Sequence, residues 1–135
     1  MNIKEVLNYL KIHGIRPLPL RVEIMKYLLE NYNHPTIENI YNDLLPAMPT
    51  LSKTTVYNTL KLFCENKAAR ALFIDEKNVR YEAQMQLHAH FRCNECNAVY
   101  DVPLEKEDVA KLSGPNGISV DETHIYFIGK CHKCK

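Results

Sequence analysis

The 135-residue sequence lacks several features that would assign it to a common class. It has no run of about 18 apolar residues, so no membrane-spanning helix is expected. No basic segment followed by an apolar stretch opens it, so we expect a cytoplasmic protein with reduced thiols. A glycine-rich phosphate loop, a Ser/His/Asp set and a paired acid-base site are also missing, so we expect neither an enzyme nor a small-molecule substrate.

Negative charge is missing from one stretch of the chain. The net charge is only +1, which by itself does not indicate nucleic-acid binding. Between Asp43 and Glu65, however, no acidic residue occurs, whereas Lys53 and Lys61 fall there. A local gap in negative charge suits a surface that faces phosphate groups.

Apolar residues at helical spacing predict four helices in the first 65 residues. The first covers residues 3–12 and ends near Gly14, and the second is entered through prolines. Thr36 and Ser52 are expected to cap the third and fourth helices. The inward faces include Ile3, Val6, Leu7 and Leu10 in the first helix and Val56, Leu60 and Phe63 in the fourth.

The other face of the fourth helix, residues 53–65, has the composition expected of a helix that enters the major groove of DNA. Apolar runs at 68–74 and 78–82 then predict a hairpin. Residues 1–83 are therefore predicted to form a winged helix-turn-helix DNA-binding domain. Its candidate DNA contacts are Arg21, Lys53, Thr54, Thr55, Tyr57, Asn58 and Lys61, with Lys77 and Arg80 as further phosphate contacts.

Residues 83–87 read as a hinge, and residues 84–135 as a small α/β domain, which makes the whole chain α+β. The pattern predicts strands at 89–92 and 98–102, a helix at 105–112 and a long strand at 118–128. The expected core is thin for an independent domain. We therefore expect this part of the chain to be buried in a homodimer.

Two Cys-x-x-Cys pairs, Cys93/Cys96 and Cys131/Cys134, are the most specific signal in the chain. Four thiolates fill a tetrahedral coordination sphere and leave no open position, which predicts a structural zinc site. The alternative is a redox dithiol. Cys64 is left over and is expected to be a small apolar filler.

A second group of candidate ligands lies around His88 and His90. Residues two apart in a strand point the same way, so these imidazoles could share one ion, although they could also be ordinary polar residues. With His34, Glu82 and Asp101 they would make a nitrogen- and oxygen-rich set. Such a set suits Fe(II) or Mn(II) better than zinc.

Taken together, these motifs resemble the ferric uptake regulator superfamily nearly end to end. The resemblance implies a homodimeric, metal-dependent transcriptional regulator, usually a repressor, that binds palindromic double-stranded operator DNA. It also implies that His34, Glu82, His88, His90 and Asp101 bind the regulatory metal between the two domains, and that the four paired cysteines bind structural zinc. The matching segments are Gly14-Ile15-Arg16, Pro19 and Arg21, His34-Pro35-Thr36, Thr54-Thr55-Val56-Tyr57, Arg80-Tyr81-Glu82, His88-x-His90-x-x-Cys93-x-x-Cys96, Asp101 and Cys131-x-x-Cys134.

Departures from the family pattern help to distinguish its iron-sensing branch from its peroxide-sensing branch. Leu87 and Ala89 replace an His-x-Asp that begins a further metal site in many iron sensors, so we do not expect that site. Leu18 stands at the family's usual threonine, so the second helix loses a hydroxyl cap. Glu82 resembles the iron sensors, whereas Asn58 and Asp101 resemble the peroxide sensors.

In the peroxide-sensing members, bound Fe(II) reacts with peroxide and oxidises a ligand histidine, and here His34 and His88 are the candidates. Two alternatives remain open. One is a zinc-responsive regulator, although those members typically bring a cysteine into the regulatory site. The other is a zinc-stapled winged-helix interaction module without metal sensing, whose binding would not change on replacing His88 and His90.

Overall fold

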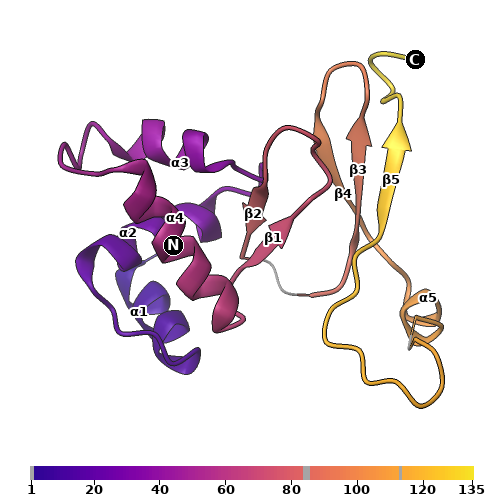
Figure 1. The fold of residues 1–135 in the computed structure, drawn as a ribbon, viewed down its shortest axis with the longest axis horizontal. Coiled ribbons are helices and arrows are strands. Elements are labelled where there is room, and N and C mark those ends of the chain that lie inside the picture. The colour runs from indigo at the N-terminus through magenta and orange to yellow at the C-terminus, as the bar shows by residue number, and fades with distance from the viewer. Residues whose placement is uncertain (1, 84–85, 113) are drawn as a thin grey trace. The chain divides into compact units, whose positions relative to one another are not determined.

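The computed structural model describes residues 2–83, 86–112 and 114–135. The chain divides into two compact units, residues 1–85 (unit 1) and 86–135 (unit 2), which Figure 1 shows as a helical part with a hairpin and a sheet-containing part. The predicted hinge at 83–87 includes positions 84 and 85, which lie outside the described residues. No helix in the described ranges is long and apolar enough to cross a membrane.

Unit 1 follows the predicted order of helices and then a hairpin (Figure 1). Strands β1 and β2 pair antiparallel, with Arg70 opposite Glu82. This arrangement is the predicted winged helix-turn-helix. Its elements are α1 (Ile3–Ile12), α2 (Pro19–Glu30), α3 (Ile37–Leu44), α4 (Lys53–Glu65), β1 (Arg70–Leu72) and β2 (Arg80–Glu82).

Side-chain caps set the starts of α3 and α4, as predicted. Thr36 Oγ1 accepts from Asn39 N at 3.1 Å, and the Asn39 side chain accepts from Thr36 N at 3.0 Å, which completes a reciprocal capping box. Ser52 Oγ accepts from Thr55 N at 3.1 Å. Helix α2 starts without a side-chain cap bond at Leu18, in agreement with the missing hydroxyl, and relies on Pro19 to fix its first turn.

The core of unit 1 is apolar and closely packed. Val56, Leu60 and Phe63 of α4 are fully buried, as are Val6 and Leu10 of α1. The prediction for α1 was half wrong. The predicted inward residues that stay at the surface are Ile3, 51% exposed, and Leu7, 37% exposed, because the helix turns only the row through Val6 and Leu10 toward the core.

Unit 2 contains a three-stranded sheet of order β4-β3-β5 in its described residues. Strand β3 (Ala89–Cys93) lies in the middle, antiparallel to β4 (Val99–Val102) and parallel to β5 (Tyr126–Gly129), as Figure 1 shows. Between β4 and β5 comes α5 (Lys106–Ala110), shorter than the predicted helix.

The long strand predicted over residues 118–128 is wrong. Only Tyr126–Gly129 forms a strand, because β3 is short and its parallel register runs from His90 opposite Tyr126 to Cys93 opposite Gly129. The apolar residues that suggested a longer strand lie at the surface: Ile118 is 61% and Val120 44% exposed. Phe127 and Ile128 of β5 are also more than half exposed.

Candidate functional site

The sheet of unit 2 brings the four paired cysteines together. Cys93 ends β3, and Cys96 follows after a turn. Since β5 runs parallel to β3 and pairs Gly129 with Cys93, the second knuckle is delivered to the same end of the sheet. All four cysteine sulfurs lie within 4.8 Å of one another, and Cys96 Sγ and Cys131 Sγ are 3.8 Å apart.

The donor chemistry of this cluster fits zinc. Backbone N–H groups of Cys96 and Cys131 donate to Cys93 Sγ at 3.5 and 3.4 Å, and these donors lower the pKa of the Cys93 thiol to about 6. Cys134 shares hydrogen bonds with the thiols of Cys131 and Cys93, which raise its pKa to about 12. Four sulfurs this close together suit a divalent ion, which displaces their remaining protons on binding.

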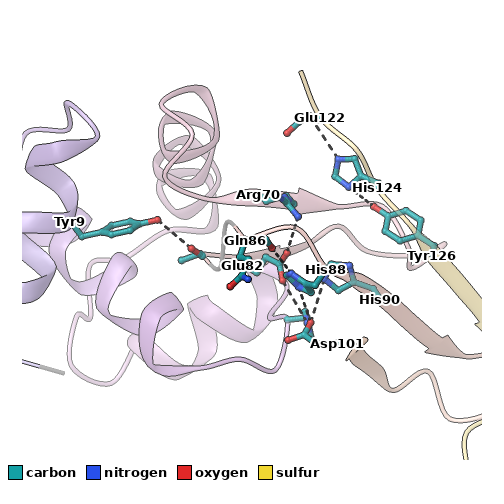
Figure 2. Close-up of polar contacts among 12 residues, drawn as sticks. Tyr9, Arg70, Glu82, Gln86, His88, His90, Asp101, Glu122, His124 and Tyr126 are labelled. Atoms are coloured by element: carbon teal, nitrogen blue, oxygen red, sulfur yellow. Dashed lines mark hydrogen bonds and ion pairs between the residues drawn. The ribbon is translucent and has the colours of Figure 1, made fainter. Parts of the chain in front are cut away.

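A second ligand set in unit 2 converges on Asp101. In the β3/β4 ladder Asp101 pairs with His90, and Asp101 Oδ1 lies 3.1 Å from His88 Nε2 and 3.5 Å from His90 Nε2 (Figure 2). Both histidines are buried, with ring centroids 4.4 Å apart. The predicted shared direction of His88 and His90 is therefore present.

The tautomer of His88 leaves its Nε2 available to a cation. His88 Nδ1 lies 2.7 Å from the carbonyl oxygen of Gln86. A carbonyl oxygen only accepts, so Nδ1 is the donor in this bond and Nε2 is the ring nitrogen left to bind a metal ion. Nε2 lies beside Asp101 Oδ1, so both atoms could bind the same ion.

Unit 1 presents its own pair of candidate ligands. His34 and Glu82 are buried, and His34 Nε2 lies 3.8 Å from Glu82 Oε2. Arg70 Nη1 is 3.7 Å from Glu82 Oε1, a contact drawn in Figure 2. Strand β2 supplies Glu82, and the segment before α3 supplies His34, which adopts the left-handed conformation with φ of 56°.

The outer face of α4 is the candidate nucleic-acid interface. The predicted contact residues from Lys53 to Lys61 on this face are exposed, and Tyr57 is 48% exposed. A surface hollow of 270 Å³ beside α4 is lined in part by Thr55, Asn58 and Arg21 of α2. Shape and exposure here suit a groove-binding helix.

Two basic residues that were predicted to contact DNA are each paired with a carboxylate of this chain. Lys53 Nζ lies 2.9 Å from Glu38 Oε2, so α3 supplies a carboxylate that the acid-free stretch of sequence did not reveal. Arg80, expected to contact phosphate, is mostly buried: its guanidinium is 3.1 Å from Asp75 Oδ2 and donates to the carbonyl of His34 at 3.2 Å. The sequence signal for the second pair was only a local Asp and Arg across the hairpin turn.

Comparison with known proteins agrees with this architecture. The curated "Peroxide-responsive repressor PerR" of Staphylococcus epidermidis is 29% identical over 135 residues, covering 98% of this chain and 90% of the relative. The protein of the same name from Staphylococcus aureus is 27% identical, covering 98% and 91%.

Solved structures show the same fold. The Helicobacter pylori ferric uptake regulator Fur matches with a TM-score of 0.76 at 18% identity, over 99% of this chain and 94% of that one. PerR from Streptococcus pyogenes matches with a TM-score of 0.54 at 28% identity, over 98% and 92%. The ferric uptake regulator family matches residues 13–128, so this chain belongs to that family of metal-responsive, DNA-binding transcription regulators.

Proposed function

We propose that this chain is a zinc-stapled, homodimeric repressor of peroxide-stress genes that binds operator DNA when Fe(II) or Mn(II) is bound. The observation that carries the proposal is that each unit, considered alone, gathers part of one nitrogen- and oxygen-rich ligand set. Unit 1 offers His34 and Glu82, and unit 2 offers His88, His90 and Asp101.

Zinc would be held by Cys93, Cys96, Cys131 and Cys134. Their sulfurs are close enough to surround one ion, and a four-thiolate shell leaves no position for substrate. The role is therefore structural. It fits a protein of the reducing cytoplasm rather than a redox enzyme.

The regulatory metal would take its ligands from both units. Three imidazoles and two carboxylates favour Fe(II) or Mn(II) over zinc, which prefers four ligands with more sulfur. Because the ligands come from separate units, binding one ion selects an arrangement of those units among several. In a dimer, that arrangement would set the two α4 helices into successive major grooves of a palindrome.

The DNA contacts would come from the outer face of α4 and from Arg21. Exposed Thr55, Tyr57 and Asn58 suit base edges, and Lys61 suits phosphate. The proposed surface also includes the exposed Thr54. It includes Lys53 as well, which would contact DNA while it is paired with Glu38. The dimer would cover exposed apolar residues of unit 2 such as Phe127 and Ile128.

The peroxide-responsive branch is supported by the names of the curated relatives and by Asn58 and Asp101. Bound Fe(II) would activate peroxide without net oxidation of the iron. Overall, a ring C–H of His34 or His88 and H2O2 would give a ring C–OH and water, with the ring supplying the two electrons, and the altered ring would bind metal less well. An iron-uptake regulator, favoured by Glu82, is the second candidate.

Anaerobic DNA binding tests this proposal. Zinc-loaded full-length protein is titrated onto a family-type palindrome without added metal, with Mn(II) and with Fe(II), and each sample then receives low peroxide. We expect either metal to promote binding and peroxide to release only the iron form, with one oxygen atom added to His34 or His88 by mass spectrometry. The His88→Ala/His90→Ala variant is the control and should not respond to metal.

Other outcomes separate the alternatives. Iron-dependent binding that survives peroxide identifies an iron-uptake regulator. Binding promoted only by additional zinc identifies a zinc-responsive regulator. Binding that is equal with and without metal, and equal in the double variant, contradicts the regulatory site and leaves a zinc-stapled interaction module.

A further inference from the structure

Arg80 does not behave as a surface arginine of a DNA-binding wing. Its side chain is only 15% exposed, and that of its partner Asp75 only 3%. One guanidinium nitrogen lies 3.1 Å from Asp75 Oδ2, while the other donates to the carbonyl of His34 at 3.2 Å. Arginine presents its donors in a rigid fork, so one side chain fixes two acceptors at once.

The backbone that Arg80 contacts is strained. His34 has φ of 56°, a conformation that few residues other than glycine adopt, and it precedes Pro35, which further restricts it. Backbone pairing with β2 also holds this segment. Tyr81 N donates to the Pro35 carbonyl at 2.9 Å, and this bond belongs to an isolated antiparallel bridge between Thr36 and Arg80.

Asp75 connects the same arginine to the turn of the hairpin. Its Oδ1 accepts from Lys77 N at 2.9 Å, while its Oδ2 contacts Arg80. A single buried carboxylate therefore orders the turn that carries Lys77 and also holds the guanidinium that fixes His34. The path from the wing turn to a proposed metal ligand therefore runs from Lys77 N through Asp75 and Arg80 to the His34 carbonyl, within unit 1.

We propose that Arg80 and Asp75 are positioning residues that set His34 for metal binding and link it to the wing turn. This inference rests on the proposed function, because it takes His34 as a regulatory ligand. Partners that orient a metal ligand typically control affinity without touching the ion. If one arrangement of these residues favours both metal binding and an ordered wing, the two binding events are coupled. Metal then strengthens DNA binding, and DNA strengthens metal binding by the same factor.

The test uses zinc-loaded full-length protein and variants of the ion pair. Arg80→Lys keeps the charge but loses the fork, so it cannot hold both Asp75 and the His34 carbonyl. Asp75→Asn keeps an acceptor for Lys77 N and weakens only the link to Arg80. Glu76→Gln is the matched control, since it removes the same charge from an exposed neighbour in the same turn.

Two quantities are measured: the Kd for Mn(II), and the ratio of the DNA Kd without and with Mn(II). We expect Arg80→Lys to raise the Mn(II) Kd by about 10-fold and to reduce the ratio, with a smaller effect of Asp75→Asn in the same direction. Glu76→Gln should change neither. Zinc content should stay the same in all three variants.

A structural role alone would lower DNA affinity equally with and without metal, and that result would overturn the inference. So would Mn(II) affinity that is unchanged in Arg80→Lys. If thermal unfolding shows that Arg80→Lys does not fold, the milder Asp75→Asn decides the question by the same two measurements. The unmodified chain tests the proposed function separately. If Mn(II) leaves its DNA binding unchanged, the proposed function fails and the inference fails with it; if the unmodified chain responds to Mn(II) and the variants respond equally, only the inference fails.

Discussion

The two units of this protein reach a defined structure by different means. Unit 1 buries a continuous set of large apolar side chains, including Leu10, Leu60 and Phe63, and side-chain caps begin its helices α1, α3 and α4. In the described part of unit 2, the buried apolar residues are Ala89, Cys93 and Cys131, whereas Phe127 and Ile128 are exposed. Unit 1 is therefore held by hydrocarbon packing, and we expect unit 2 to depend on zinc bound to its thiols and on a partner surface.

The largest difference between the two units is expected when two of the proposed zinc ligands are removed. Cys93→Ser/Cys96→Ser removes half of the thiolate shell, and structural zinc typically supplies ~10–16 kcal/mol of binding free energy that is also folding free energy. We expect unit 2 to unfold and unit 1 to keep its helices. Amide NMR spectra would show this as selective loss of dispersed signals from residues 86–135.

Cys64→Ser is the control for that experiment. Cys64 lies in α4 of unit 1 and is outside the cluster of four sulfurs. Zinc content and the NMR spectrum of unit 2 should therefore be retained. Loss of zinc from this variant, or a folded unit 2 in the double variant, would contradict the claim that unit 2 alone depends on zinc for its folding.

A cavity in the core should produce the reverse pattern. Leu10 is fully buried, so Leu10→Ala should lower the free energy of unfolding of unit 1 by ~2–5 kcal/mol. Leu7, 37% exposed on the same helix, is the matched site, and Leu7→Ala should cost much less. Chemical denaturation followed by helix content measures both, and equal losses would show that α1 packs differently.

Acidification should weaken zinc binding more steeply below a particular pH. The pKa of the Cys93 thiol is lowered to about 6, so above that pH the group already binds as thiolate, and below it zinc must also displace a proton. The slope of log zinc affinity against pH should therefore increase by about one below pH 6. Chelator competition over a pH series measures this slope, and a constant slope through pH 6 would contradict the assignment of the backbone donors to Cys93.

The smallest effect is expected from a single polar contact in unit 1. The Tyr27 hydroxyl donates to Asp43 Oδ2 at 2.6 Å, and both burial and this bond raise the pKa of Tyr27. Tyr27→Phe should lower the stability of unit 1 by only ~1 kcal/mol. Tyr32, 64% exposed, gives the control Tyr32→Phe, which should be neutral in the same denaturation experiment.

Local sequence signals predicted unit 1 well, because its elements are set by neighbours in the chain. Ser52 and Thr36 marked helix starts by the hydroxyls that cap them, and the α4 stripe was read from its spacing. The Asp75–Arg80 pair and the Glu38–Lys53 pair were not predicted, since both depend on how the elements pack.

Unit 2 shows the opposite balance. The clustering of its four paired cysteines, and of His88 and His90, was predicted because the spacing in Cys-x-x-Cys and His-x-His brings these side chains together. Strands β3 and β4 match their predicted ranges to within one residue, but the third strand was predicted too long. Ile118 and Val120 are of residue types common in strands, yet the pairing of β5 with β3 begins only at Tyr126. A pattern of apolar residues indicates a surface that tends to be buried, but it does not show whether the same chain or a partner buries that surface.

The central claim is that one regulatory ion takes ligands from both units. Its most direct test is Mn(II) binding to zinc-loaded full-length protein carrying His34→Ala in unit 1, Asp101→Ala in unit 2, or both. The account predicts one regulatory Mn(II) per chain, strongly weakened by either change, with no comparable further loss in the double variant and with metal-dependent DNA binding abolished in all three. Two independent Mn(II) sites, each lost with only one of the changes, would contradict it.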